Sequence, residues 1–335
     1  MHFIRKVNAI AVLKRTGLIV IALIVIPLSY TLESHAATWP SRPVTLIVPF
    51  TAGTTSDIIA RGLARDLGES IGQPVIVENR GGAGGNIAAA FVAHADPDGY
   101  TLLLATTGPA ATNKLMYHDM TFDPEHDFSP IVLVGKSPVI IVARPDAPFS
   151  TLKEFIDYAK VNPDKITAGY AGNGTLGHIT GELLQRTASI KFSNTQYRGT
   201  GAILVDLIGS HIDIGMDSMA AYVSSIETGK IKALAMAGQE RWSKLPDVPT
   251  VSESGLPGFE ASVWYALLAP NGIAPDIISK LNAATNKYLS SENGKAFLDN
   301  LGVTIAGGTP DQLKAFTASE LQKWAPIIKA ANISF

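Results

Sequence analysis

Two short stretches of the chain combine glycine with hydroxyl side chains where a strand pattern gives way to a helix pattern. The candidate residues are Gly53, Thr54, Ser56 and Asp57 in the first stretch and Gly172, Asn173, Thr175 and His178 in the second. The first N–H groups of a helix have no partner within it, and the helix dipole favours an anion there. These turns therefore predict an anion site made of backbone amides and hydroxyls, with Thr175 and Ser56 as the expected side-chain donors.

A purely structural interpretation of each turn remains open. Ser56 and Asp57 are residue types that cap helices, and the glycines of the second turn suit a simple connection. Asp217 poses the same question, because it ends a strand expected at residues 212–216 and precedes a helix that it or Ser218 could cap. Tyr265, on a later strand, is expected in the core, with a place in the cleft wall as the alternative.

No catalytic pattern accompanies these residues. The sequence lacks a nucleophile elbow, a zinc-binding His-Glu-x-x-His helix, a calcium loop and any cysteine, and its histidines stand singly. The glycine-rich residues 81–87 have Ile87 where a dinucleotide fingerprint needs its third glycine. We therefore expect no enzyme activity, no cofactor and no metal site.

The N-terminus has the layout of a cleaved secretory signal. Basic residues (Arg5, Lys6, Lys14 and Arg15) precede an apolar run over residues 17–30, and small residues follow at Ser34 and Ala36. We expect residues 1–36 to be removed and the mature protein to reside in the periplasm. An uncleaved membrane anchor is the alternative. Without a cysteine after the apolar run, a lipoprotein anchor is excluded.

Charge and length indicate which partners are not expected and how many domains the chain forms. Cleavage after Ala36 leaves 23 basic against 28 acidic residues, a net charge of −5 with no basic stripe, so nucleic acid is not expected as a partner. A chain of about 300 residues without disulfides needs a large core, and at this length the core usually divides into two domains.

Alternating strand and helix patterns predict an α/β fold in which each domain is a mostly parallel sheet flanked by helices. The expected strands are residues 43–49, 75–79, 100–105, 131–134, 139–143, 166–171, 212–216, 233–237 and 264–269. The expected helices are residues 57–67, 87–95, 152–162, 178–188, 202–210, 220–228, 275–290, 294–301 and 310–331. Residues 37–142 with 258–335 should form domain 1 and residues 143–257 domain 2, with the ligand cleft between them.

Several ordered motifs resemble those of the tripartite tricarboxylate transporter substrate-binding proteins, or Bug receptors. They are WPSRP at residues 39–43, PFTAGTTSD at 49–57, VENR at 77–80, DGYTL at 98–102, YRGTG at 197–201, LPDVPT at 245–250 and GLPGFE at 255–260. The resemblance spans the whole mature chain.

The resemblance implies a Venus-flytrap fold in which two strand-to-helix loops hold a ligand carboxylate through amides, hydroxyls and bridging waters. It also implies a monomer that delivers its solute to integral membrane transporter subunits. Thr107 joins the candidate ligand-binding residues, in a loop that lacks the histidine common in the family. Gly53-Thr54 and Gly81 replace a common Gly-Gly pair and a proline, so the carboxylate is not identified. A ligand sensor and an exported hydrolase are the alternative functions.

Overall fold

The computed structural model describes residues 39–335, which form one compact unit. The expected signal segment, residues 1–36, lies outside the described residues. No helix within residues 39–335 is both long and apolar enough to span a bilayer.

Strands and helices alternate along most of the chain. The strands are β1 (Val44–Val48), β2 (Val75–Asn79), β3 (Thr101–Thr106), β4 (Phe128–Ala143), β5 (Thr167–Tyr170), β6 (Ser193–Gln196), β7 (Ile214–Ser218), β8 (Lys232–Met236), β9 (Ser262–Pro270) and β10 (Thr304–Gly307). The α-helices are α1 (Thr55–Ile71), α2 (Asn86–Ala93), α3 (Thr107–Ala110), α4 (Leu152–Val161), α5 (Leu176–Ala188), α6 (Thr200–Ile208), α7 (Val223–Glu227), α8 (Pro275–Ser290), α9 (Glu292–Asn300) and α10 (Pro310–Ala331). Three 3₁₀ turns, η1 (Ala83–Gly85), η2 (Thr112–Leu115) and η3 (Met219–Ala221), complete the set.

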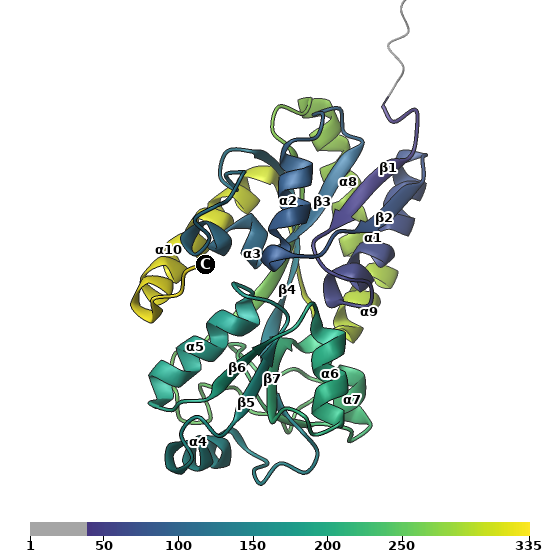
Figure 1. Cartoon of the computed structure of the whole chain (residues 1–335). Coiled ribbons are helices and arrows are strands. Elements are labelled where there is room, and N and C mark those ends of the chain that lie inside the picture. Colours follow the sequence, from purple (N-terminus) through teal and green to yellow (C-terminus); the bar gives the residue numbers. More distant parts are fainter. Residues whose placement is uncertain (1–38) are drawn as a thin grey trace, which may run out of the picture. The chain divides into compact units, whose positions relative to one another are not determined.

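The long strand β4 joins two halves of one curled sheet, ordered β2-β1-β3-β9-β4-β7-β5-β6 (Figure 1). Residues 128–138 of β4 pair with β9 and residues 139–143 pair with β7 and β8, all antiparallel. We call β1, β2, β3, β9, β10 and residues 128–138, with helices α1–α3 and α8–α10, the first lobe. The second lobe comprises residues 139–143, β5–β8 and α4–α7.

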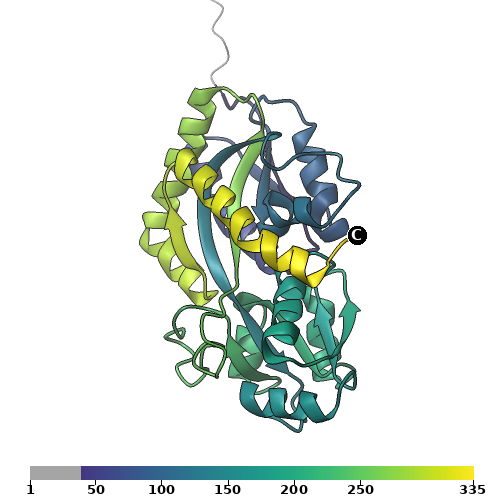
Figure 2. The ribbon, with the colours of Figure 1, turned by 90° about the vertical axis from the view of Figure 1, so that its left-hand side faces the viewer.

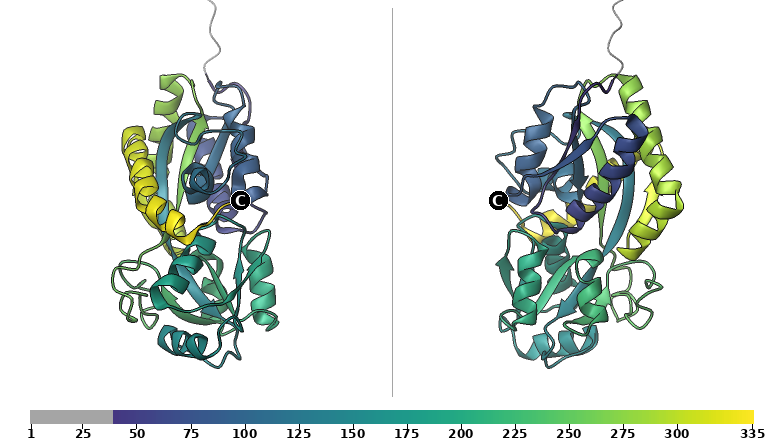
Figure 3. Two further views of the ribbon diagram at one scale, coloured as in Figure 1. Left: turned by 60° about the vertical axis from the view of Figure 1, so that its left-hand side comes forward. Right: turned by 90° about the vertical axis from the view of Figure 1, so that its right-hand side faces the viewer.

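Helices cover both faces of the first lobe's sheet. α1 packs against α8 and α9 on one face, while α2 and α10 lie on the other, where α10 runs diagonally toward the second lobe (Figures 2 and 3). In the second lobe, α6 and α7 bury Ile203, Leu207 and Val223 in one apolar cluster, and α5 packs against β7. This two-lobed, helix-flanked sheet confirms the predicted α/β class.

Several details differ from the sequence expectation. The helix expected at residues 220–228 is divided into η3 and α7, and the short helix α3 was not expected. Residues 131–134 and 139–143 belong to the single strand β4, because Gly135 and Pro138 remain paired with Tyr265 and Ser262 of β9 despite register shifts. Parallel pairing is confined to β2-β1-β3 and β6-β5-β7, and the strands between them are antiparallel. The short strands β6 and β10 were not expected, since exposed polar residues such as Ser193 and Thr304 give little strand signal.

A buried carboxylate joins α10 to the sheet of the first lobe. Trp264 Nε1 on β9 and Trp324 Nε1 on α10 both donate to Glu320 Oε2, each at 3.1 Å. Both indoles are almost fully buried, so neither has water as an alternative acceptor. The bond from Trp264 therefore ties α10 to β9, in addition to the apolar packing of Leu313 and Ile328.

Replacing Glu320 by leucine should destabilise the protein by about 2–4 kcal/mol, because two buried indole N–H groups lose their acceptor. Glu320→Gln is the matched control, since its side-chain oxygen can still accept both bonds. Chemical denaturation of the two variants measures the difference. Equal stability of the leucine and glutamine variants would show that the shared acceptor contributes little.

Candidate functional site

A pocket lies between the lobes, at the two glycine-rich turns predicted from sequence. It encloses about 500 Å³, space open to solvent included. The first lobe contributes Phe50, Thr54, Thr55, Ser56, Gly84, Thr106, Thr107, Gly108, Val263 and Tyr265, and the second contributes Ala171, Thr175, Leu176, Thr200, Asp217 and Ser218. The hydroxyl-bearing residues among them are nearly all buried. A ligand here would touch both lobes.

Three helices of eight or more residues begin at this pocket. α1 starts at Thr55, α5 at Leu176 and α6 at Thr200, and the first residue of each lines the pocket. The preceding residues are Thr54, Thr175 and Gly199, and none forms a side-chain cap bond. The N–H groups of each first turn are therefore left to other acceptors, which makes this an anion-binding environment.

The two glycine-rich turns share one internal geometry. Thr54 Oγ1 donates to Thr51 O and Thr175 Oγ1 donates to Gly172 O, both at 2.8 Å and both across three residues. Since a hydroxyl carries one proton, Thr175 donates to its own turn and not into the pocket in this conformation. A ligand that takes the Thr175 proton must displace this bond.

Thr55 differs from these neighbours because its buried hydroxyl oxygen has no hydrogen-bond partner among the described residues. Burial raises the pKa of Tyr265, and the Thr55 side chain lies close enough to the Tyr265 hydroxyl to oppose this rise slightly. The Tyr265 proton, however, is donated to Ser218 Oγ at 3.0 Å, and Ser218 donates to Ser137 Oγ at 3.1 Å. An unpartnered buried hydroxyl is costly, so its presence in a pocket indicates a group that a ligand or water satisfies.

Asp217 is the acidic side chain that lines the pocket. No Lys, Arg or His of residues 39–335 lines the pocket. The Thr200 hydroxyl donates to Asp217 Oδ2, and the Ser218 N–H donates to Oδ1 at 2.7 Å. Burial raises the pKa of Asp217 and outweighs the opposing effect of these two bonds. An anion in this pocket would therefore be stabilised by helix ends and not by side-chain cations.

The predicted residues divide into two groups. Thr54, Ser56, Thr107, Thr175 and Asp217 line the pocket. Gly53, Asp57, Gly172, Asn173 and His178 do not line it and hold the turns from behind. Apart from Thr107 and Asp217, both groups belong to the two glycine-rich turns, and only some of their side chains face the pocket.

In the first turn, the supporting residues form an ion pair behind the pocket. Asp57 Oδ2 accepts from the Gly53 N–H at 2.9 Å, and the Asp57 carboxylate pairs with Arg61. Burial alone would raise the pKa of Asp57, but the bonds from Arg61, Gly53 and Asn79 together lower it. Asp57 therefore stays ionised and fixes the shape of its turn.

In the second turn, the support comes from uncharged groups. Gly172 adopts φ 152° and supplies the carbonyl that Thr175 bonds. His178 Nδ1 accepts from the Gly174 N–H at 3.3 Å, and burial lowers the pKa of His178. A neutral imidazole suits this acceptor role.

Thr55, Thr200, Ser218 and Tyr265 line the pocket but were not among the predicted ligand-binding residues. Thr200 stands between Gly199 and Gly201 at a helix start, so the glycine and hydroxyl pattern of the other turns could have found it. Tyr265 is buried in the core and also lines the pocket, so both interpretations of this residue apply. Nothing in the sequence distinguished Thr55 from the neighbouring hydroxyl residues Thr54 and Ser56.

Comparison with known proteins identifies the family. The profile of the tripartite tricarboxylate transporter family receptors matches residues 59–333. The chain belongs to this receptor family. It is 36% identical to Protein BugT of Bordetella pertussis over 295 residues, covering 88% of this chain and 90% of BugT.

Solved structures agree with this assignment. A Rhodopseudomonas palustris protein described as bound to adipate has a TM-score of 0.86 and 34% identity, covering 88% of this chain and 99% of that one. MatC of Rhodopseudomonas palustris, described with bound malate, has a TM-score of 0.82 and 34% identity, covering 86% of this chain and 99% of that one. These are periplasmic binding protein folds, and the chain is accordingly a solute receptor and not an enzyme.

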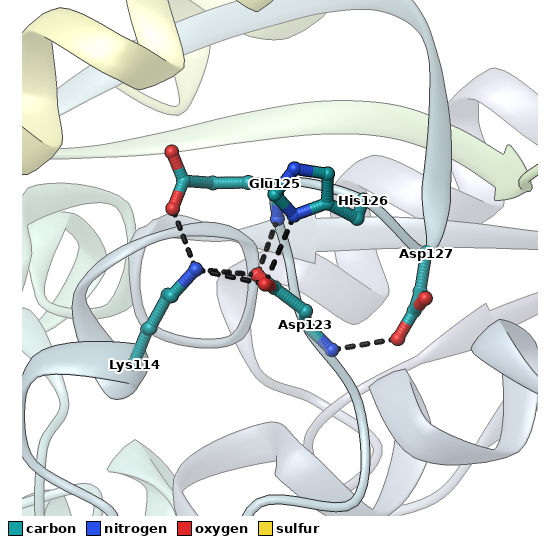
Figure 4. Close-up of polar contacts among 5 residues, drawn as sticks. All are labelled: Lys114, Asp123, Glu125, His126 and Asp127. Carbon is teal, nitrogen blue, oxygen red and sulfur yellow. Dashed lines mark hydrogen bonds and ion pairs between the residues drawn. The ribbon is translucent and has the colours of Figure 1, made fainter.

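In this receptor, a charge cluster joins η2 to the segment that precedes β4 (Figure 4). Lys114 Nζ contacts both Asp123 oxygens at 2.8 Å and Glu125 Oε2 at 2.7 Å. Burial alone would raise the pKa of Asp123, but bonds from Lys114, His126 and the Glu125 N–H lower it to about 2. The cluster therefore holds η2, which follows the pocket residues Thr106 and Thr107.

The same segment touches the second lobe directly. The Tyr117 hydroxyl donates to Asn173 O at 2.7 Å, and the C-terminal Phe335 ring lies 5.2 Å from the Tyr117 ring and 5.9 Å from the His178 ring. In Figure 2, the end of α10 reaches the second lobe at this place. In this structure the two lobes are therefore in contact beside the pocket.

Replacing Thr55 by valine should leave the ligand-free melting temperature unchanged or raise it, because the shape is kept and an unpartnered hydroxyl is removed. Thr175→Val is the matched comparison and should cost about 0.5–1.5 kcal/mol, since its bond to Gly172 O is lost. Differential scanning calorimetry of both variants checks this. Equal destabilisation would mean that the Thr55 hydroxyl has a partner in solution.

Proposed function

We propose that this receptor captures a small carboxylate solute in the periplasm and passes it to the integral membrane subunits of a tripartite tricarboxylate transporter. The observation that carries the proposal is the convergence of three uncapped helix N-termini on one buried, hydroxyl-rich pocket. The two related structures that are described as bound to adipate and to malate support carboxylates as the ligand class.

The carboxylate would accept hydrogen bonds from the first-turn amides of α1 and α5, with the lining hydroxyls bonding it directly or through water. Thr54, Ser56, Thr107, Thr175 and Asp217 line the pocket and are proposed to contact the ligand or its waters. Gly53, Asp57, Gly172, Asn173 and His178 would act by shaping the turns. Because donation from backbone amides needs no side-chain rearrangement, the site is largely formed before the ligand arrives.

Capture is proposed to involve closure of two domains, residues 37–142 with 258–335 and residues 143–257. A ligand that contacts both sides of the pocket binds the closed form more tightly than an open one and so shifts the population toward closure. The contacts of Tyr117 and Phe335 with the second lobe would then form or tighten on binding. Closure also gives the transporter a surface that reports occupancy.

A thermal-shift screen tests the ligand class. Mono-, di- and tricarboxylates, hydroxy acids, amino acids and aromatic acids should include at least one that stabilises the receptor. A ligand at a hundredfold excess over its Kd adds about 2.7 kcal/mol, or roughly 4 °C for a chain of this length.

The neutral amide of each stabilising acid is the matched control and should give no shift, because it lacks the anion that the helix ends favour. A panel in which no acid shifts the melting curve, or in which acid and amide act alike, would contradict the proposed function.

A further inference from the structure

The pocket contains a carboxyl group whose presence is not explained by capture of a carboxylate alone. Asp217 lines the pocket, and no cationic side chain contributes to its electrostatic environment. When Asp217 is ionised, an anionic ligand meets a second negative group in the same pocket. A buried carboxylate without a positive partner costs free energy unless hydrogen-bond donors compensate it.

The bonds made by Asp217 within the protein leave it incompletely satisfied. It accepts one bond on each oxygen, from the Thr200 hydroxyl and from the Ser218 N–H. An ionised carboxylate offers about four acceptor positions, so roughly two remain. The nearby Tyr222 hydroxyl is buried with no partner among the described residues and does not fill them.

A structural role alone accounts for only part of this arrangement. By accepting from Thr200, Asp217 holds the start of α6, as a helix cap would. That role would be served equally by a carboxyl group sealed from the pocket. Asp217 instead lies at the end of β7, opposite Ile140 of β4, with the pocket before it.

Resting on the proposed function, we propose that the solute carries a hydrogen-bond donor, a hydroxyl or an ammonium group, in addition to its carboxylate, and that Asp217 accepts it. The helix ends of α1 and α5 then bind the anion and Asp217 binds the donor. The receptor selects short hydroxy acids or amino acids over acids of the same skeleton without the donor. Asp217 is thus a specificity-determining residue.

Matched acids test this selection by isothermal titration. The sets are propionate, lactate and alanine; succinate, malate and aspartate; and glutarate, 2-hydroxyglutarate and glutamate. Wild-type receptor should bind a hydroxy or amino member about tenfold to a hundredfold more tightly than the plain acid of its set. In Asp217→Asn this ratio should fall to near one, because the asparagine has lost the charge and one acceptor oxygen.

Asp217→Asn retains the size of the side chain and one oxygen, so its melting temperature shows whether α6 is still held. Asp247→Asn, at an exposed residue between β8 and β9 and outside the pocket lining, is the matched control for charge and should keep the wild-type ratio.

Tighter binding of plain acids than of their substituted partners, or an unchanged ratio in a folded Asp217→Asn, would overturn the inference while leaving carboxylate capture intact. Failure of every acid, substituted or not, to bind would overturn the proposed function and this inference with it.

Discussion

The first N–H groups of a helix cannot be satisfied by the helix itself, and in this receptor three sets of them face one pocket. α1, α5 and α6 begin there without side-chain caps. The glycine-rich turns use their threonine hydroxyls internally, at Thr51 O and Gly172 O, and so leave the amides free. The pocket therefore attracts an anion through backbone dipoles, which keep one position and do not need to be ordered when the ligand binds.

The rest of the fold serves to bring these helix ends together. β4 runs through both lobes, and α1 and α5 each follow a parallel strand of one lobe. The Asp57–Arg61 pair and the Lys114 cluster stand outside the pocket and fix the segments that line it. These ion pairs thus stabilise the segments that line the pocket. Asp217 is the carboxyl group within the lining.

Much of this arrangement could be predicted from the sequence, because the relevant signals are local. α8 and α10 have the predicted bounds, each with a proline in its first turn, and a capping box at Thr309 marks the start of α10. The glycine and hydroxyl pattern also marked two turns that contribute residues to the lining of the pocket. β6 escaped prediction since its burial and polarity are those of a loop, and the continuity of β4 through Gly135 and Pro138 depends on pairing with β9.

Side-chain roles at the site could not be read from local sequence in the same way. Thr55 and Thr54 are adjacent and identical in type, yet one hydroxyl bonds its turn and the other has no partner. Ser218 is joined to Tyr265 and Ser137, residues 47 and 81 positions away. Such assignments follow from tertiary contacts, which residue type and spacing do not specify.

The central claim is that backbone amides at two helix ends hold the carboxylate. Amide resonances of the deuterated receptor, followed by NMR during titration with a carboxylate that stabilises it, test this most directly. The account predicts downfield proton shifts at Thr55, Ser56, Leu176 and Gly177 on saturation, as expected for N–H groups that gain an anionic acceptor. Unchanged shifts at these amides in a receptor saturated with ligand would contradict it.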